Sequence, residues 1–407
     1  MGTRRVTDIS AQLRLARVIN ATGTVTRLGA SQLDAEVIAA MAEAAQSSVD
    51  IADLQGRACD LIAQCTGAEA GIVTSGAMAG LLLGAAACIA GFDPAKMDKL
   101  PQTEGMRNEF IVPKSHRNSY DHGVRAAGGR LVEVGLPDRS TGCGVRDTEA
   151  WEIGAAVCDR SAGVLYLAGA DSRPPLEQVV RAAHAANLPV LVDAAAQLPP
   201  AQNLHRFIDA GADLVVFSGG KGIGGPSASG ILCGRRRLVA SALLQQLDLD
   251  YLYDDWQPPA RLIDKRDFPG VPRHGIGRPC KVGKEQIAGL LTALARFSRE
   301  DDAARNRRFG LIAQALIEAL PRTAALTART IADAGHAGMP LVEVAIAPRV
   351  GGPNAASIAA ALRNGTPSIH VDATNADLGV LVLAPTCLKS EEAVLIGAAF
   401  ARAVAVA

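Results

Sequence analysis

Two side chains in this 407-residue chain have the types and positions that a cofactor site needs. Lys221 stands in the glycine-rich segment 217–230, directly after the apolar run 212–217. Asp193 ends an earlier apolar run, residues 188–193. An amine and a carboxylate at two strand ends suit pyridoxal 5'-phosphate (PLP), because its aldehyde needs an amine and its ring nitrogen needs an acid that keeps it protonated. The pair predicts a PLP site.

Other interpretations of the glycine-rich segment fit less well. A Walker phosphate loop requires Ser or Thr after its lysine, whereas Lys221 is followed by glycine. A dinucleotide fingerprint must open a helix, whereas residues 220–225 lead into Pro226 and the strand-like run 229–233. A solvated loop lysine is the plainest alternative, but it leaves Asp193 without a role.

A phosphate site is predicted where a strand gives way to an apolar helix. Thr74, Ser75, Gly76 and Ala77 occupy that junction, and small residues there let backbone N–H groups at a helix start bind phosphate. Ser218, three residues before the catalytic lysine candidate, can add a hydroxyl. The alternative role of the junction is tight strand–helix packing.

Further candidates would contact the ring or the substrate. His116 follows the strand-like run 109–112 and can stack its imidazole on the pyridine ring, with Tyr120 and His122 as competitors. Gln197 can meet the ring's phenolic oxygen or the substrate. An ordinary core or surface histidine is the alternative for His116.

An amino-acid substrate also needs a group that binds its carboxylate, and arginine offers a paired fork of donors. Arg278, in the glycine-rich turn 274–284, is the first candidate, and a surface charge is its alternative role. The next candidates are Arg27, Arg349 and Arg363.

The predicted chemistry is carbanion chemistry at the substrate's Cα. A carboxylate at Asp193 raises the pKa of the ring nitrogen and makes the ring an electron sink. Lys221 first binds the aldehyde, is displaced by the substrate amine, and then removes the Cα proton as general base.

Composition excludes several other classes of function. The 41 basic and 41 acidic residues cancel, so no overall field recruits nucleic acid or an anionic membrane. Eight cysteines without a C-x-x-C pair indicate neither a metal site nor a disulfide framework. No apolar run reaches membrane-spanning length without interruption. We expect a cytoplasmic protein without a metal.

The order of apolar runs predicts an α/β fold with a mostly parallel sheet. Short strands alternate with helices, and the ligands of such sheets lie outside the carboxyl ends of the strands. The expected organisation is an N-terminal segment (1–50), a large PLP-binding domain (51–275) and a smaller C-terminal α/β domain (276–407). The polar stretch 92–108 is predicted to be a loop.

These motifs together resemble the fold-type I, aspartate-aminotransferase-like PLP enzymes. More narrowly, they resemble the group of selenocysteine synthase (L-seryl-tRNA selenium transferase) and D-glucosaminate-6-phosphate ammonia-lyase. The resemblance rests on the segments 18–24, 53–57, 74–77, 193–197, 217–226 and 277–285.

The resemblance implies a seven-stranded-type sheet, a Schiff-base lysine at Lys221, a pyridinium partner at Asp193, and phosphate bound by the Ser75 loop and Ser218. It also implies a homodimer or larger assembly in which the segment Gln55 to Arg57, or the N-terminal segment, reaches a neighbouring active site. Arg57 is therefore a candidate substrate ligand.

The chain differs from selenocysteine synthase in two ways that bear on the expected reaction. About 17 residues precede Val18, which leaves no room for the tRNA-binding domain of selenocysteine synthase, and Gly220 stands where that enzyme commonly has aspartate. We expect a lyase that eliminates water from a small β-hydroxy-α-amino acid or amino-sugar acid and releases ammonia and a 2-keto acid. The alternatives are an amino-acid racemase, epimerase or aldolase, then a tRNA-dependent selenium transferase, and finally a PLP-binding protein without catalysis.

Overall fold

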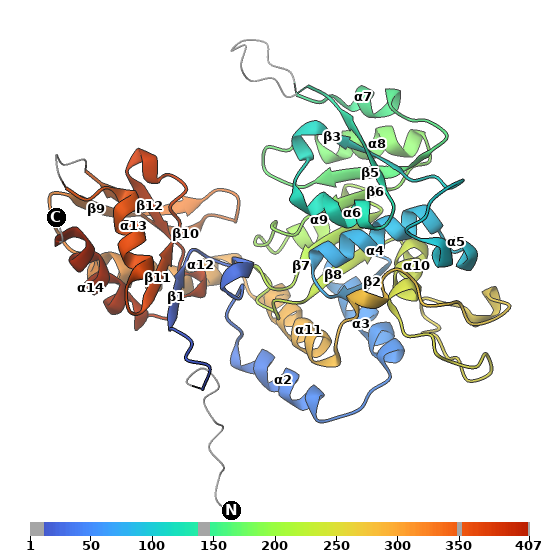
Figure 1. Cartoon of the computed structure of the whole chain (residues 1–407), viewed down its shortest axis with the longest axis horizontal. Helices are drawn as coiled ribbons and strands as arrows, with labels where there is room; N and C mark the ends of the chain where they lie inside the picture. The colour runs from blue at the N-terminus through green and yellow to red at the C-terminus, as the bar shows by residue number, and fades with distance from the viewer. Residues whose placement is uncertain (1–11, 137–146, 348–351, 406–407) are drawn as a thin grey trace, which may run out of the picture. The chain divides into compact units, whose positions relative to one another are not determined.

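The chain forms two compact units in the computed structural model (Figure 1). The sheet unit is Gln32–Glu300, and the terminal unit combines Met1–Ser31 with Asp301–Ala407. The boundaries expected after residues 50 and 275 both lie inside the sheet unit. The structure describes residues 12–136, 147–347 and 352–405.

A seven-stranded sheet forms the centre of the sheet unit, in the order β2-β8-β7-β6-β5-β3-β4. Only β8 runs antiparallel to its neighbours, so the sheet is mostly parallel, as predicted. The strands are β2 (Ala70–Thr74), β3 (Glu109–Pro113), β4 (Arg130–Val134), β5 (Ser161–Leu167), β6 (Val190–Asp193), β7 (Leu214–Ser218) and β8 (Gly230–Gly234).

Helices cover both faces of this sheet because its strands are apolar on both sides. In β7, Val215 and Phe217 face one apolar core, while Leu214 and Val216 face the other. The first core is completed by α2 (Ala35–Ala45), α3 (Ile51–Thr66), α7 (Ala150–Ala155), α8 (Leu176–Ala185), α9 (Asn203–Asp209) and α11 (Lys284–Arg299). The second is completed by α4 (Ala77–Ala90), α5 (Pro94–Lys99), α6 (His122–Ala126) and α10 (Arg236–Gln246).

Helix α11 explains why the sheet unit extends beyond the boundary expected at residue 275. Its residues Ile287, Leu290 and Leu294 are all fully buried in the first core. The helix therefore belongs to the sheet unit by its packing, although it follows a long polar loop in the sequence.

The stretch 92–108 is not the continuous loop that the sequence predicted, because it contains α5. Asp93 caps this helix by accepting from the backbone N–H groups of Ala95 and Lys96 at 3.0 and 3.3 Å, and Pro94 occupies its first position. An Asp-Pro pair is a helix-start signal, so the helix could have been predicted from local sequence.

In the part of the chain that the structure describes, the terminal unit contains two small sheets and three α-helices of ten or more residues. Strand β1 (Val18–Ala21) pairs in parallel with β11 (Ser368–Val371), which draws the N-terminal segment into this unit. An antiparallel sheet has the order β12-β10-β9. Its strands are β9 (Leu326–Asp333), β10 (Met339–Ile346) and β12 (Val380–Leu383), and the helices are α12 (Asp302–Ala319), α13 (Ala355–Asn364) and α14 (Glu392–Ala405).

Among the described residues, no helix is long and apolar enough to cross a membrane.

Gln55 of α3 closes the open edge of the large sheet. β2 is an edge strand, and the N–H and C=O of Val73 point away from β8 toward the helix. The Val73 N–H donates to Gln55 Oε1 at 2.9 Å, and Gln55 Nε2 donates to the Val73 carbonyl at 2.8 Å. Gln55 is completely buried, so it replaces the missing strand at this position.

Replacing Gln55 by methionine keeps the side-chain volume but leaves both Val73 groups unpaired. We expect Gln55→Met to lower the free energy of unfolding by about 2–4 kcal/mol, because each buried unpaired group costs about 1–3 kcal/mol. Urea denaturation measures the change. Gln64→Met, at an exposed position of the same helix, is the control; equal stability of both variants would contradict this role.

Candidate active site

The parallel register places the predicted cofactor residues at one edge of the sheet. Asp193, the last residue of β6, pairs with Leu167 at the end of β5 and with Val216 on β7. On the other side, Gly230 of β8 pairs with both Ser218 and Thr74. The carboxyl ends of β2, β7, β6 and β5 therefore form one continuous edge.

Asp193 is a buried carboxylate at this edge. Only 6% of the residue is exposed, and its Oδ1 accepts from the Ala195 N–H at 3.1 Å. Burial raises the pKa of Asp193, while that N–H and the charge of Lys221 act in the opposite direction. A cation beside the carboxylate would offset this burial, which is what a protonated ring nitrogen supplies.

Backbone packing holds the loop that carries Lys221. A Cβ on Gly222 would lie 2.1 Å from the Leu198 carbonyl oxygen, and one on Gly220 would lie 2.7 Å from the Ser227 Cα. The Gly224 N–H donates to the Lys221 carbonyl at 2.9 Å, and Gly224 has φ +76°. The glycines thus permit close approach to the segment that follows Asp193, rather than marking a loose loop.

The junction between β2 and α4 has the form of a phosphate cradle. Gly76 is the N-cap residue of α4 and has no side chain that could accept a hydrogen bond. The first backbone N–H groups of α4 are therefore not capped by the N-cap residue. A Cβ on Gly230 would lie 2.7 Å from the Gly76 carbonyl carbon and 2.9 Å from the Ala77 nitrogen. Ser218 ends the strand beside it.

The hydroxyl of Ser75 has a protein partner that the sequence did not indicate. It donates to the Cys280 carbonyl at 3.0 Å, and Gln246 Nε2 donates to the same carbonyl at 3.2 Å. Gln246 Oε1 in turn accepts from Gln55 at 3.4 Å. A line of buried amides thus joins the open edge of the sheet to the turn that contains Arg278. Consecutive glutamines at the end of an apolar helix were the signal that could have revealed it.

His116 lies at the end of β3, against the end of β5. Its Nδ1 accepts from the Leu167 N–H at 3.3 Å, and its ring meets Tyr166 edge-on with centroids 4.7 Å apart. The residue is 3% exposed, and its Nε2 has no hydrogen-bond partner among the described residues. Burial lowers its pKa to about 4, so the ring is neutral with its proton on Nε2.

The competitors of His116 lie on the surface. Tyr120 is 59% exposed, and His122 is an exposed residue whose Nδ1 contacts the Arg125 guanidinium at 3.2 Å. Of the three side chains, only His116 is buried against the strand ends.

Arg278 and Gln197 are held mainly by their neighbours. One terminal nitrogen of Arg278 donates to Asp248 Oδ2 at 2.6 Å, which the sequence did not predict. The Gln197 carbonyl accepts from Asn203 Nδ2 at 2.7 Å, and the Gln197 N–H donates to the Ala194 carbonyl at 3.1 Å. The main chain after Asp193 is therefore fixed.

The segment Gln55 to Arg57 divides between two environments. Gln55 is completely buried and pairs with Val73 of its own chain, so the expectation that this segment reaches a neighbouring active site stays a prediction for Arg57. Arg57 is exposed, and its Nε donates to Asp53 Oδ2 at 3.0 Å.

Two of the alternative arginines line a cavity in the terminal unit. Arg27 and Arg363 flank His370 there, in a space of about 390 Å³. Burial and these two guanidinium groups lower the pKa of His370. Arg349 lies outside the described residues.

Comparison with known proteins identifies the family. Residues 169–247 match the family model for aminotransferase class-V. The 5'-C-glycyluridine monooxygenase-decarboxylase of Streptomyces sp. is 31% identical over 389 residues, which cover 93% of this chain and 88% of that protein. The chain belongs to the fold-type I PLP-dependent enzymes.

Within these PLP-dependent enzymes, a second relative matches almost end to end. The D-glucosaminate-6-phosphate ammonia lyase of Salmonella typhimurium is 29% identical over 397 residues, 96% of each chain. A solved structure of D-glucosaminate-6-phosphate ammonia-lyase has a TM-score of 0.79 and 29% identity, with 98% of both chains covered. This places the chain in the group of that lyase and selenocysteine synthase.

The described residues fit PLP, the cofactor of this family. Three features lie along one edge of the sheet. They are the buried Asp193 carboxylate, whose pKa is raised by burial, the Nε2–H of the neutral His116, and the start of α4, which a Cβ on Gly230 would crowd. These features need a partner with a cationic nitrogen and an anionic group, and PLP carries both.

The low pKa of His116 predicts a specific loss of stability in acid. The unfolded chain takes up this proton near pH 6.5 and the folded protein only near pH 4, so the stabilisation is complete above about pH 6.5 and is lost as the pH falls toward 4. Between about pH 7.5 and 5, wild type should lose about 2 kcal/mol more unfolding free energy than His116→Asn.

Urea denaturation at the two pH values measures this difference. His122→Asn removes an exposed histidine and should show the acid sensitivity of wild type. If His116→Asn were as acid-sensitive as the control, a neutral buried His116 would be ruled out.

Proposed function

We propose that this PLP-dependent enzyme is a lyase that eliminates water from a small β-hydroxy-α-amino acid or amino-sugar acid. The products are ammonia and a 2-keto acid. The observation that carries this choice is the match to D-glucosaminate-6-phosphate ammonia lyase along 96% of both chains. The buried Asp193 and the glycine-held Lys221 loop support it, because the reaction begins with loss of a Cα proton.

The roles of the residues follow from their environments. Bound PLP supplies an electron-withdrawing ring conjugated to the substrate's Cα. Asp193 keeps the proton on the ring nitrogen, and Thr74, Ser75, Gly76, Ala77 and Ser218 bind the phosphate. In the structure the Ser75 hydroxyl donates to the Cys280 carbonyl, so to bind phosphate it would have to rotate and donate there instead, while the backbone N–H groups donate directly.

Lys221 serves as both the attachment point and the general base. Its amine would hold the cofactor and, when free of it, would take the Cα proton of the substrate. His116 packs against the ring as a neutral group and offers one Nε2–H donor, and Gln197 meets the ring oxygen or substrate from the fixed segment after Asp193.

Arg278 is the proposed ligand of the substrate carboxylate. Asp248 occupies one of its terminal nitrogens, and the turn that carries it is fixed by Ser75 and Gln246 through Cys280. Arg57, exposed on α3, is proposed to reach the active site of a neighbouring subunit in a homodimer or larger assembly.

Replacing Asp193 tests the assignment of the cofactor residues. Asp193→Asn should still hold PLP on Lys221, because the amine is intact, but an amide cannot keep the ring nitrogen protonated. We expect Cα-proton exchange of a bound amino acid to slow by about tenfold or more, which is 1.4 kcal/mol in the barrier. NMR in deuterated water measures the exchange.

Two controls accompany that experiment. Asp209→Asn changes an exposed aspartate and should exchange at the wild-type rate. Borohydride reduction and peptide mapping should place the pyridoxyl group on Lys221 in all three proteins. Label on Lys281 or Lys284, or wild-type exchange in Asp193→Asn, would contradict the assignment.

A second candidate function is an oxygen-dependent decarboxylase. The relative from Streptomyces named 5'-C-glycyluridine monooxygenase-decarboxylase favours it, at 31% identity over nearly the whole chain. Such an enzyme breaks the bond from Cα to the carboxylate and consumes O2, whereas the lyase breaks the Cα–H and Cβ–OH bonds and consumes no O2.

Product analysis in deuterated water separates these functions. With D-glucosaminate 6-phosphate and D- and L-serine or threonine, the lyase should release ammonia and a 2-keto acid in equal amounts, with or without air. Carbon dioxide with O2 uptake would indicate the decarboxylase. Clean inversion with deuterium at Cα would indicate a racemase, and an aldehyde with glycine an aldolase.

A further inference from the structure

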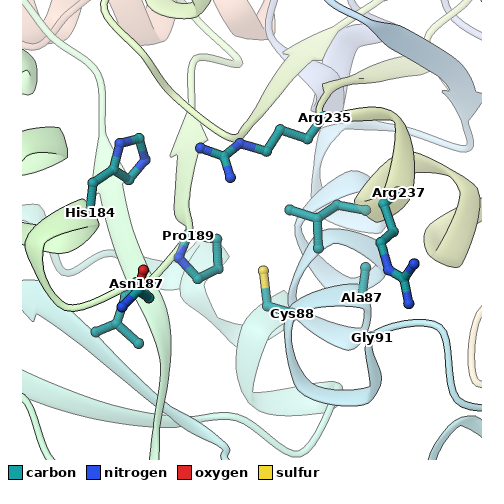
Figure 2. A pocket seen from close by; sticks show the side chains of 10 residues that line it. Ala87, Cys88, Gly91, His184, Asn187, Pro189, Arg235 and Arg237 are labelled. Atoms are coloured by element: carbon teal, nitrogen blue, oxygen red, sulfur yellow. The ribbon is translucent and has the colours of Figure 1, made fainter.

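The sheet unit contains a cavity at the end of the sheet opposite the candidate active site. Its volume is about 550 Å³, within the range of small-ligand sites. It is lined by the segment that enters β6, by the end of α4 and by the start of α10 (Figure 2). Asp193 ends the same strand that Pro189 precedes, so the two sites are separated by the length of β6, about 10 Å.

A buried carboxylate beneath this cavity is already neutralised. Asp213 is 1% exposed, and its Oδ1 lies 2.5 Å from Arg235 Nε. Its Oδ2 contacts His184 Nε2 at 2.9 Å and accepts from the Val190 N–H at 2.7 Å. Figure 2 shows the Arg235 side chain extending across the cavity toward His184. Because Nε is the atom that meets Asp213, the two terminal nitrogens of Arg235 keep their donors for a ligand.

A second guanidinium adds a charge that no carboxylate balances. Arg237 pairs with no carboxylate of the described residues and instead lies over the Phe92 ring, 5.7 Å from its centroid. No acidic residue of the described ranges lines the cavity. Arg235 offsets Asp213, so Arg237 leaves about one positive charge for a bound anion.

The rest of the wall is apolar. Ala87 and Leu188 are buried, and Pro189 and Leu238 complete this surface. Cys88 points its sulfur into the space in Figure 2, and burial raises the pKa of this thiol to about 12, so it stays uncharged. Such a wall favours a ligand with a hydrocarbon or aromatic body.

We propose that this cavity binds a small monocarboxylic acid with an apolar body. The carboxylate would lie against the terminal nitrogens of Arg235, and the body would cover Ala87, Leu188 and Leu238. The Arg237 guanidinium points away from Arg235 in Figure 2 and would add its charge from the rim of the cavity. This site is independent of the proposed catalytic residues, since none of them lines the cavity.

Isothermal titration of the PLP-loaded protein with benzoate tests the proposal. We expect one benzoate per chain with a dissociation constant of about 1 mM or lower, and binding of the neutral analogue benzamide weaker by about tenfold or more. Arg235→Gln should weaken benzoate binding by about tenfold or more, since it loses a charged contact. Arg237→Gln should weaken it by about threefold, since it removes a positive charge at the rim of the cavity.

Arg236→Gln is the matched control. Arg236 lies between the two arginines in sequence, but its terminal nitrogens donate to the carbonyls of Arg261 and Glu69 at 2.8 and 3.0 Å, outside the cavity. Its variant should bind benzoate as wild type does. Because Arg235→Gln removes the partner of buried Asp213 and can unfold the chain, Arg237→Gln decides the result where Arg235→Gln is not folded.

Three results would overturn the proposal. They are no benzoate binding up to about ten times the expected dissociation constant, equal effects of Arg236→Gln and Arg237→Gln, and loss of binding in Arg278→Lys. The last result would place benzoate at the proposed substrate carboxylate site instead. Failure of the lyase assay leaves this titration unaffected, so the two proposals fail separately.

Discussion

The parallel hydrogen-bond register of β5, β6 and β7 is the constraint on which the candidate site depends. Parallel neighbours end at the same edge, and the register opposes Leu167, Asp193 and Val216 there. The antiparallel strand β8 then carries the edge to Thr74, because Gly230 pairs with both Thr74 and Ser218. Thr74 and Ser218 are far apart in the chain, but both pair with Gly230 because the hydrogen bonds between strands fix their register.

Buried polar groups at this edge of the sheet lower the stability of the fold, whereas apolar groups there would not. Asp193 is a buried carboxylate whose pKa burial raises, and His116 is a buried imidazole with an unpaired donor. Both features cost stability in an isolated chain, and both have a purpose where a ligand supplies the complementary charge or acceptor. The cofactor of this family carries those groups, so its binding would add to the stability of the folded chain.

The amides around Gln55 connect the fold to the site. Gln55 satisfies the open edge of β2, Gln246 contacts Gln55, and Cys280 accepts from both Gln246 and Ser75. The phosphate junction and the Arg278 turn therefore share one carbonyl. A shift of the phosphate junction would strain the Arg278 turn, and the reverse, because breaking the buried hydrogen bonds that join them costs free energy.

Local sequence by itself determined the elements and the chemistry of the main residues. The alternation of short apolar strands with helices, and the strand-to-helix junction at residues 74–77, were predicted and are observed, because apolar period and glycine or proline breaks are local signals. The types of Lys221 and Asp193 were enough to indicate PLP, since few other cofactors need that pair. The family comparisons confirm the cofactor and the fold.

Only the tertiary structure decided which unit each segment joins and which partners the candidate side chains have. The N-terminal segment joins the terminal unit through β1 and β11, and α11 joins the sheet unit through its buried face, because long-range pairing and packing override chain order. Of the three ring candidates only His116 is buried, Gln55 lies inward against β2, and Arg278 pairs with Asp248 near the surface. Each of these depends on distances between residues remote in sequence, and no local pattern records those distances.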